Sequence, residues 1–330
     1  MKIIKLFFLL LLIITSSNLS SAENFDDWLK TFKVRAIKEG VSEKTFDLTM
    51  ANVKFLPKVI QYDRYQPEFY EDTLSYISKR SGKRKIIKGI ELYKKNKDFI
   101  NLIDKEFGIE KELLLALMGI ETNFGTYVGK MDIISSLATL SFDQRRSEFF
   151  TKELITILKL VDSDVIDPKI LYGSWAGAFG NFQFMPSTIN NYAIDFNKNN
   201  LIELKSIEDS FASAANYLNK IGWKKNKPCF IEIDLKDNIP EKYLNTSAQK
   251  LKFKKKLKFF KKYLNNFEHD ISDELYAAVI TPDYEIIDNA EKLKPAYLVF
   301  SNYELILKWN RSLRFGLAVC TLKEKFKNEI

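Results

Sequence analysis

The amino-acid sequence predicts a mainly α-helical protein, α+β overall, with one small β-containing insertion. Three observations support this fold class. Apolar residues recur at helical spacing through most of the chain, and alternating apolar and polar residues occur only after Pro228. The 330 residues include only 12 Gly and 8 Pro, about half the usual share of each. A loop-rich, collagen-like or low-complexity chain is therefore excluded, and 46% hydrophobic residues suffice for a core.

Residues 1–22 have the pattern of a secretory signal peptide. Lys2 and Lys5 precede an unbroken apolar run over 6–14, and small residues end the segment at Ala22. Nine apolar residues are too few to cross a bilayer, and no Cys follows them to accept a lipid anchor. We expect a periplasmic protein exported by a cleaved signal peptide; an uncleaved anchor is the alternative.

The charge and the rare residue types narrow the function classes. The net charge of +8 falls to +6 without residues 1–22, and Lys outnumbers Arg 43 to 8, which is weak support for phosphate recognition. Export argues against a nucleic-acid partner and leaves an anionic wall or membrane surface open. With one histidine, His269, a catalytic triad or a four-ligand zinc site is disfavoured. Whether Cys229 and Cys320 pair stays open, and we expect a monomer.

The first part of the mature chain, residues 23–106, is expected to be an N-terminal α region. Trp28, Phe32 and Ala36 follow each other at a spacing of four, as on one helix face. Turn-forming residues predict where its helices break: Pro57, Pro67 and Ser81–Gly82. Helices are expected to continue over 107–227, which holds seven of the twelve glycines between positions 108 and 180.

Residues 228–300 are expected to form the small β-containing region, with strands over 229–235, 276–280 and 296–300. The chain then returns to helix over 301–330. Eight lysines fall within 250–262, between apolar residues. They predict either a surface for anionic wall polymer or lipid, or a solvated Lys-rich helix or loop, and we favour the solvated segment.

Glu121 is the first candidate for chemistry. The segment 111–125 is an almost wholly apolar helix in which Glu121 is the interior acid, just before the expected glycine stop at Gly125. Partial desolvation by its neighbours would favour the neutral acid and raise the pKa of this carboxyl, which suits a general acid. A solvated glutamate at a helix end is the alternative.

The second candidate segment is 173–187, which holds three glycines and four aromatic residues. Glycines let a ligand approach the backbone, and Ser174 and Gln183 offer hydrogen bonds to a hydroxyl-rich ring. A tight helix corner packed by small residues explains the same composition. Pro186 fits the first turn of a following helix.

These segments together resemble the lytic murein transglycosylase B family. The resemblance rests on Ala116–Gly125, on 137–150, on Ser174–Gly180 and on Gln183–Ser187. Further matches, in chain order, are these: 66–69, 215–218 with 222–223, 302–303 and 310–312. The likeness covers essentially the mature chain and is weakest across the β-containing insertion.

The resemblance implies a lysozyme-like α-helical catalytic core and cleavage of the β-1,4 bond between N-acetylmuramic acid and N-acetylglucosamine in peptidoglycan. Glu121 matches the family's single catalytic acid. It would protonate the leaving oxygen and then, as the carboxylate, take the proton of the muramic C6 hydroxyl, which closes on C1 to a 1,6-anhydro product. No second carboxylate and no cofactor are required, in contrast to ordinary glycosidases.

By the same matching, four residues would line the glycan cleft: Ser174, Gln183, Tyr217 and Asn310. Arg145 and Arg146 would meet the carboxylates of the stem peptide, or would form a surface ion pair with Glu148 or Asp143.

A candidate weak calcium site follows at residues 195–209. Asp195, Asn197 and Asn199 stand at loop positions 1, 3 and 5, and Leu201 would offer its carbonyl. The usual closing acid is absent at position twelve, and the resemblance places Asp209 as a later one. An Asn-rich turn without metal is the alternative.

Two other functions stay open from the sequence. A lysozyme-type hydrolase would recruit Asp132 or Asp143 as a second carboxylate, and a catalytically silent protein would only bind peptidoglycan glycan strands.

Overall fold

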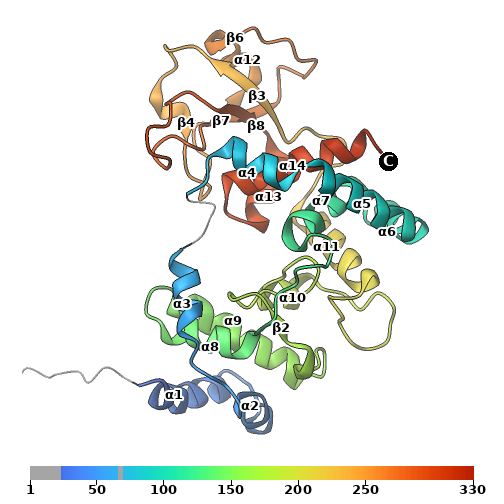
Figure 1. Cartoon of the computed structure of the whole chain (residues 1–330), viewed down its shortest axis with the longest axis vertical. Coiled ribbons are helices and arrows are strands. Elements are labelled where there is room, and N and C mark those ends of the chain that lie inside the picture. The colour runs from blue at the N-terminus through green and yellow to red at the C-terminus, as the bar shows by residue number, and fades with distance from the viewer. Residues whose placement is uncertain (1–23, 66–69) are drawn as a thin grey trace, which may run out of the picture.

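The computed structural model describes residues 24–65 and 70–330. Helices build the lower and middle parts of the molecule in Figure 1, and the strands after residue 228 form a separate region at the top. Fourteen α-helices belong to the described residues, with these bounds: α1 Phe25–Lys38, α2 Glu43–Met50, α3 Pro57–Arg64, α4 Thr73–Arg80, α5 Lys83–Lys95, α6 Lys97–Phe107, α7 Lys111–Thr122, α8 Ile133–Phe142, α9 Ser147–Asp162, α10 Pro186–Tyr192, α11 Ile207–Ile221, α12 Leu257–Phe260, α13 Ser301–Trp309 and α14 Leu313–Lys327.

The local signals of the sequence explain where these helices begin and end. The Asn24 side chain caps α1 by accepting a hydrogen bond from the Asp27 amide, and Phe32 and Ala36 are buried as their spacing predicts. Proline stands at the first position of α3 and of α10. The predicted breaks at Pro57 and at Ser81–Gly82 are confirmed, whereas Pro67 and the motif 66–69 lie outside the described residues.

The six-stranded sheet has the order β4-β7-β8-β3-β6, and β5 also pairs with β7. Its strands are β3 Phe230–Leu235, β4 Leu244–Asn245, β5 Lys255–Lys256, β6 Leu264–Asn265, β7 Tyr276–Ile280 and β8 Ala296–Val299. The antiparallel pairs β3–β8 and β7–β8 form its centre, so the three runs that the sequence predicts as strands are adjacent in the sheet. The expected strand positions are confirmed.

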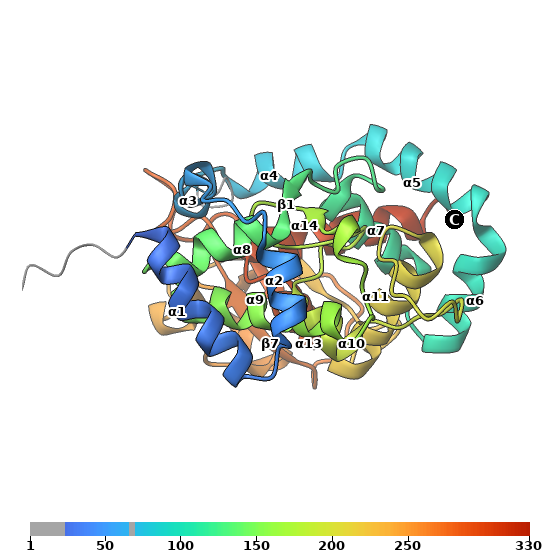
Figure 2. The same ribbon diagram turned by 90° about the horizontal axis from the view of Figure 1, so that it is seen from below.

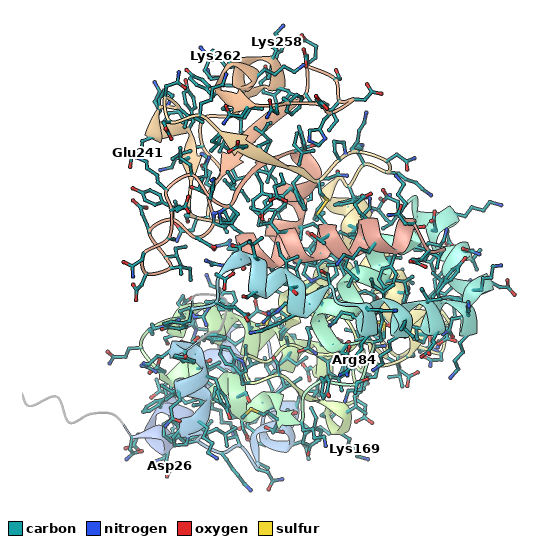
Figure 3. The ribbon with its side chains drawn as sticks, turned by 45° about the horizontal axis from the view of Figure 1, so that its top comes forward. Asp26, Arg84, Lys169, Glu241, Lys258 and Lys262 are labelled. Carbon is teal, nitrogen blue, oxygen red and sulfur yellow. A yellow bond between two sulfur atoms is a disulfide. The ribbon has the colours of Figure 1, made fainter. Side chains whose placement is uncertain are left out.

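Covalent and buried polar links hold the sheet region against the helices. A disulfide joins Cys229, just before β3, to Cys320 in α14, with their Cα atoms 6.2 Å apart; sulfur bonds are drawn in yellow in Figure 3. The buried carboxylate of Asp283 pairs with Arg314 of α14 at 2.7 Å and accepts from the amide and hydroxyl of Thr73 in α4. The question that the sequence left open is answered, because the two cysteines pair.

Helix α14 lies inside the molecule and packs on α7, α4 and α5. Figure 2 shows it behind the helices of the lower part. Small residues let the helices approach closely: Gly89 of α5 and Gly119 of α7 both face the ring of Phe124, and Gly89 also faces Phe326. The helix that carries Glu121 is therefore fixed by its neighbours on the side opposite to solvent.

The lysine-rich segment 250–262 belongs to the sheet region. Four of its eight lysines form ion pairs: Lys254 with Glu304, Lys256 and Lys258 with Glu274, and Lys261 with Asp273. This pairing favours the solvated segment over a binding surface.

Over residues 24–65 and 70–330, the structure contains no helix of the length and apolar character needed to cross a membrane.

Candidate active site

Glu121 lies in the last turn of α7, at the edge of the main hydrophobic core. The six residues Leu113–Met118 of this helix are all buried, because the helix is surrounded by others, and Glu121 is half-buried. The left-handed residue that ends the helix is Asn123, with φ 50°, and not the expected Gly125. Phe124 and Gly125 also have positive φ, so three residues turn the chain sharply away from Glu121.

The Glu121 carboxylate is held by a tryptophan from the far end of the chain. Nε1 of Trp309, the last residue of α13, donates a 3.0 Å hydrogen bond to Oε1 of Glu121. The Trp309 ring stacks on Tyr217 with centroids 5.0 Å apart, and Tyr192 stacks on the other face of Tyr217 at 4.4 Å. Phe184 meets the Trp309 ring edge-on at 5.3 Å. The acid therefore borders an aromatic wall.

Tyr217 is part of this wall and comes from α11. It is 8% exposed, and its hydroxyl donates a 3.2 Å hydrogen bond to the carbonyl of Lys308. Burial raises the pKa of Tyr217 to about 12, with a smaller contribution from Tyr192, so its hydroxyl stays neutral at any working pH. The structure thus brings Tyr217 next to the residue that contacts Glu121.

The segment 173–187 folds against the end of α7. Strand β2, Tyr172–Gly173, pairs with β1, Met131–Asp132. Thr122 of α7 donates from its hydroxyl to the Asn181 carbonyl at 2.8 Å, and the Asn181 amide side chain donates to the start of α11. Gln183 donates from Nε2 to the carbonyls of Val128 and Gly180. Two segments that are distant in the sequence therefore form one unit around Glu121.

The glycines of this segment act differently from what the sequence suggested. A Cβ at Gly173 would collide with the Ala178 carbonyl, at Gly177 with Leu137, and at Gly180 with Leu204. The space in front of these glycines is filled by the protein itself, so they permit tight packing of the segment. The interpretation that glycan lies against their backbone is replaced by the tight-corner alternative.

Ser174 and Asn310, two candidate glycan-binding residues, differ in their surroundings. The Ser174 hydroxyl accepts from the Ala178 amide at 2.9 Å and so closes a turn. Asn310 ends α13 in extended backbone next to Trp309, and its side chain is half-buried. The expected helix over 301–330 is thus interrupted at Asn310, because α13 ends at Trp309 and α14 begins at Leu313. No donor to Oε1 of Gln183 is present within the described part of the chain.

Arg145 and Arg146 share a partner that the sequence did not predict. Nε of Arg145 lies 2.9 Å from Oδ2 of Asp63, and Arg146 also pairs with Asp63, which is 1% exposed in α3. The ion pair expected with Glu148 or Asp143 was wrong in its partner, because Glu148 pairs with Arg35 and Asp143 with Arg64. Two guanidinium groups around one buried carboxylate leave an excess positive charge at this corner.

The loop after α10 is folded by its own oxygen atoms. Asp195 accepts from the amides of Asn199 and Asn200, and Asn199 accepts from the Leu201 amide. The buried Asp209 carboxylate accepts from the amides of Phe196 and Glu203, 2.9 Å each. No group of three or more His, Cys, Asp or Glu side chains suited to a metal occurs in 24–65 and 70–330. The loop offers carboxylate and amide oxygens as possible metal ligands, and most of these ligands are uncharged.

Sequence reasoning missed Trp309 and Asp63 as parts of the site. Trp309 directly precedes Asn310, and a tryptophan beside a candidate glycan residue is a signal that points to it. Asp63 had no comparable signal, because an acid among polar residues in a short helix does not show in the sequence that its side chain is buried.

Comparison with known proteins agrees with this architecture. The fold is that of a mainly helical protein with a small sheet, and the site is a single glutamate beside an aromatic wall. Residues 24–324 match the model of the transglycosylase SLT domain. The chain belongs to this family, which is a lytic transglycosylase enzyme family.

Several relatives are similar over different lengths. The membrane-bound lytic murein transglycosylase B of Escherichia coli is 39% identical over 138 residues, which are 42% of this chain and 38% of that protein. Pseudomonas aeruginosa SltB3, solved in complex with NAG-NAM-pentapeptide, superposes with a TM-score of 0.80 at 29% identity, over 92% of this chain and 80% of that one. Escherichia coli lytic transglycosylase SLT35, in complex with calcium, gives 0.76 at 25% identity, over 91% and 92%.

Proposed function

We propose that this chain cleaves the β-1,4 bond between N-acetylmuramic acid and N-acetylglucosamine in peptidoglycan, and leaves 1,6-anhydromuramic acid ends. The observation that carries the proposal is the Glu121 carboxyl at the end of a buried helix, oriented by Trp309 beside an aromatic wall. SltB3 was also solved with NAG-anhNAM-pentapeptide, and it matches this chain at 29% identity. That ligand contains the anhydro sugar that this reaction forms.

The chemistry needs one carboxyl group that is first acid and then base. Protonated Glu121 gives its proton to the leaving glycosidic oxygen as the C1–O bond breaks. The resulting carboxylate then takes the proton of the muramic C6 hydroxyl, whose oxygen bonds to C1. Glu121 is therefore protonated again at the end of the reaction, and no water molecule takes part in it.

The candidates for a second carboxylate already have structural roles. Oδ1 of Asp132 caps α8 by accepting from the Ser135 amide, and Asp143 pairs with Arg64 at 2.8 Å. A lysozyme-type hydrolase would need one of them free to act on water or on C1. These contacts favour the single-carboxyl mechanism.

Glycan contacts are proposed for Ser174, Gln183, Tyr217 and Asn310. The proposal is supported by the packing of their segments against the end of α7 or against Trp309. The excess charge of Arg145 and Arg146 beside Asp63 supports their proposed contact with stem-peptide carboxylates.

Mass spectrometry of digested sacculi tests the function. The mature protein is expected to release 1,6-anhydromuropeptides, and Glu121→Gln is expected to release none while keeping its circular dichroism spectrum. Glu112→Gln, in the first turn of the same helix, is the matched control and should retain activity. Reducing-end products would favour the hydrolase, and sacculus binding with no cleavage by the wild type would favour a silent binding protein.

Calcium binding at the loop 195–209 is a separate proposal. Asp195, Asn197, Asn199, Leu201 and Asp209 would supply the oxygens, and two charged ligands predict weak affinity. The folded loop, in which Asp195 already accepts the amide of the sixth loop residue, supports it. Calorimetric titration with calcium should show heat that Asp195→Asn abolishes and that Asp164→Asn retains. Absence of heat and of thermal stabilisation would end the proposal.

Export and domain division are also proposals. Residues 1–22 lie outside the described residues, and N-terminal sequencing of the protein from a periplasmic fraction is expected to begin at Glu23. The boundaries 23–106, 107–227, 228–300 and 301–330 would be tested by limited proteolysis, which should cut first near residue 228 or 300.

A further inference from the structure

A cavity of about 430 Å³ opens at the end of α7, on the side facing α5. Its lining holds five cationic side chains, one glycine and one amide: Lys79, Gly82, Lys83, Arg84, Lys85, Lys88 and Asn123. We call this the cationic cavity. Figure 3 shows Arg84 beside α5 and α7 on the side facing the viewer. The lining contains no carboxylate from the described residues.

The positive charge of the cationic cavity is largely uncompensated. Lys85 donates from Nζ to the Gly119 carbonyl at 2.5 Å, and Lys88 donates to the Thr126 hydroxyl. Both acceptors are neutral. Lys83 and Arg84 are exposed, and over 24–65 and 70–330 neither forms an ion pair. Lys79 does form an ion pair, with Glu71.

Two further features make the cavity attractive to an anion. Helix α5 begins here, and its N-cap residue Gly82 has no side chain to accept from the first-turn amides. Burial, together with the nearby charges of Arg80 and Lys88, lowers the pKa of Lys85 to about 8. A bound anion would relieve the repulsion among these cations and accept from the amides.

We propose that the cationic cavity binds a carboxylate of a peptidoglycan stem peptide. Asn123, which lines the cavity, follows Glu121 by two residues, so the cavity adjoins the catalytic turn. The stem peptide is attached to the muramic acid whose bond is cleaved, and five extended residues reach about 17 Å. A carboxylate on that peptide can therefore reach the cavity while the sugar contacts Glu121.

The cationic cavity is separate from the arginine pair. Arg145 and Arg146 contact Asp63 of α3, whereas most of the cavity lining comes from the start of α5, and α3 and α5 lie far apart in both views (Figures 1 and 2). Muramic acid recurs at every second sugar, so one strand presents several peptides. The two cationic places would hold carboxylates of different peptides on the same strand.

The inference rests on the proposed function. Measuring the reaction on two substrates tests the inference and the proposed function separately. Rates are compared on peptide-bearing glycan strands and on strands from which an amidase has removed the peptides. Lys83→Ala/Arg84→Ala is expected to raise KM about three- to tenfold on peptide-bearing strands, because it removes two charge contacts that are exposed and therefore individually weak. On peptide-free strands its KM should equal that of the wild type. Lys94→Ala/Lys95→Ala removes the same charge from the other end of α5 and should leave both KM values unchanged.

Three results would overturn the inference. The first is an equal KM for the double variant and the wild type on peptide-bearing strands. The second is an equal rise in KM on both substrates. The third is a loss of sedimentation with anionic phosphatidylglycerol vesicles, without any change on peptide-bearing strands, which would assign the cavity to lipid. If the wild type forms no anhydro product on either substrate, the proposed function fails instead.

Discussion

Nε1 of Trp309 donates a 3.0 Å hydrogen bond to Oε1 of Glu121, across 188 residues of sequence. The bond ties the end of α13 to the end of α7. Because Oε1 accepts the indole proton, one oxygen of the carboxyl has a fixed direction. Stacking on Tyr217 in turn fixes the Trp309 ring, so the orientation of the acid depends on packing between three helices.

Trp309→Phe is expected to lower kcat about tenfold or more. The phenyl ring keeps the stacking on Tyr217 but cannot donate, and a hydrogen bond to a charged group contributes about 1.5–3 kcal/mol. Since the indole stabilises the carboxylate over the neutral acid, its loss should also move the alkaline limb of the pH–rate profile upward. Trp28→Phe in α1 is the control. An unchanged kcat and profile would assign Trp309 to packing alone.

Gly129→Ala is expected to unfold the turn that supports the segment 173–187. Gly129 has φ 84°, and a Cβ there would collide with the Gly173 backbone beside the β1–β2 pair. Gly108→Ala separates the two causes, because Gly108 also has positive φ, 65°, but nothing within 4 Å. Gly108→Ala should lower the unfolding free energy by about 1 kcal/mol and keep activity. Gly129→Ala should lose activity and more stability; equal losses in urea denaturation would contradict the steric argument.

Local patterns in the sequence were enough to predict the helices and the central strands, and they made Glu121 a candidate that the family resemblance then singled out. Phe32 and Ala36, four residues apart, reveal a helix face, and the short apolar run 276–280 reveals a buried strand, without knowledge of their neighbours. Apolar surroundings likewise distinguish Glu121 from surface acids.

Contacts between distant segments were not predictable from such patterns. For the glycines of 173–187, ligand approach and a tight corner explain the sequence equally, because a sequence does not show that Leu137 and Leu204 fill the space. For the same reason Asp63 was missed as the partner of Arg145. These choices depend on which elements pack together, and a single sequence does not determine them.

Reduction of the Cys229–Cys320 disulfide is expected to destabilise the protein. The bond closes a 91-residue separation between the sheet region and α14, and chain entropy assigns about 4–5 kcal/mol to a loop of that length. Urea denaturation with and without dithiothreitol measures the loss. Cys229→Ala/Cys320→Ala should match the reduced wild type and should not respond to dithiothreitol. Identical curves for oxidised and reduced wild type would contradict the prediction.

Lys85 is expected to make stability rise with pH between about 8 and 10.5. Its pKa in the folded protein is about 8, lowered by burial and then by the charges of Arg80 and Lys88, while the ordinary value is 10.5. In that window the unfolded chain holds a proton that the folded protein has released, so raising the pH favours folding. Lys85→Met removes this titration together with the hydrogen bond to Gly119. The unfolding free energies of the wild type and of Lys85→Met are measured in urea at pH 7, 8, 9 and 10. The value for the wild type minus the value for the variant should increase with pH. Lys94→Met, exposed on the same helix, should give a difference that does not rise, and a flat difference for Lys85→Met would mean that Lys85 is charged in the folded protein throughout.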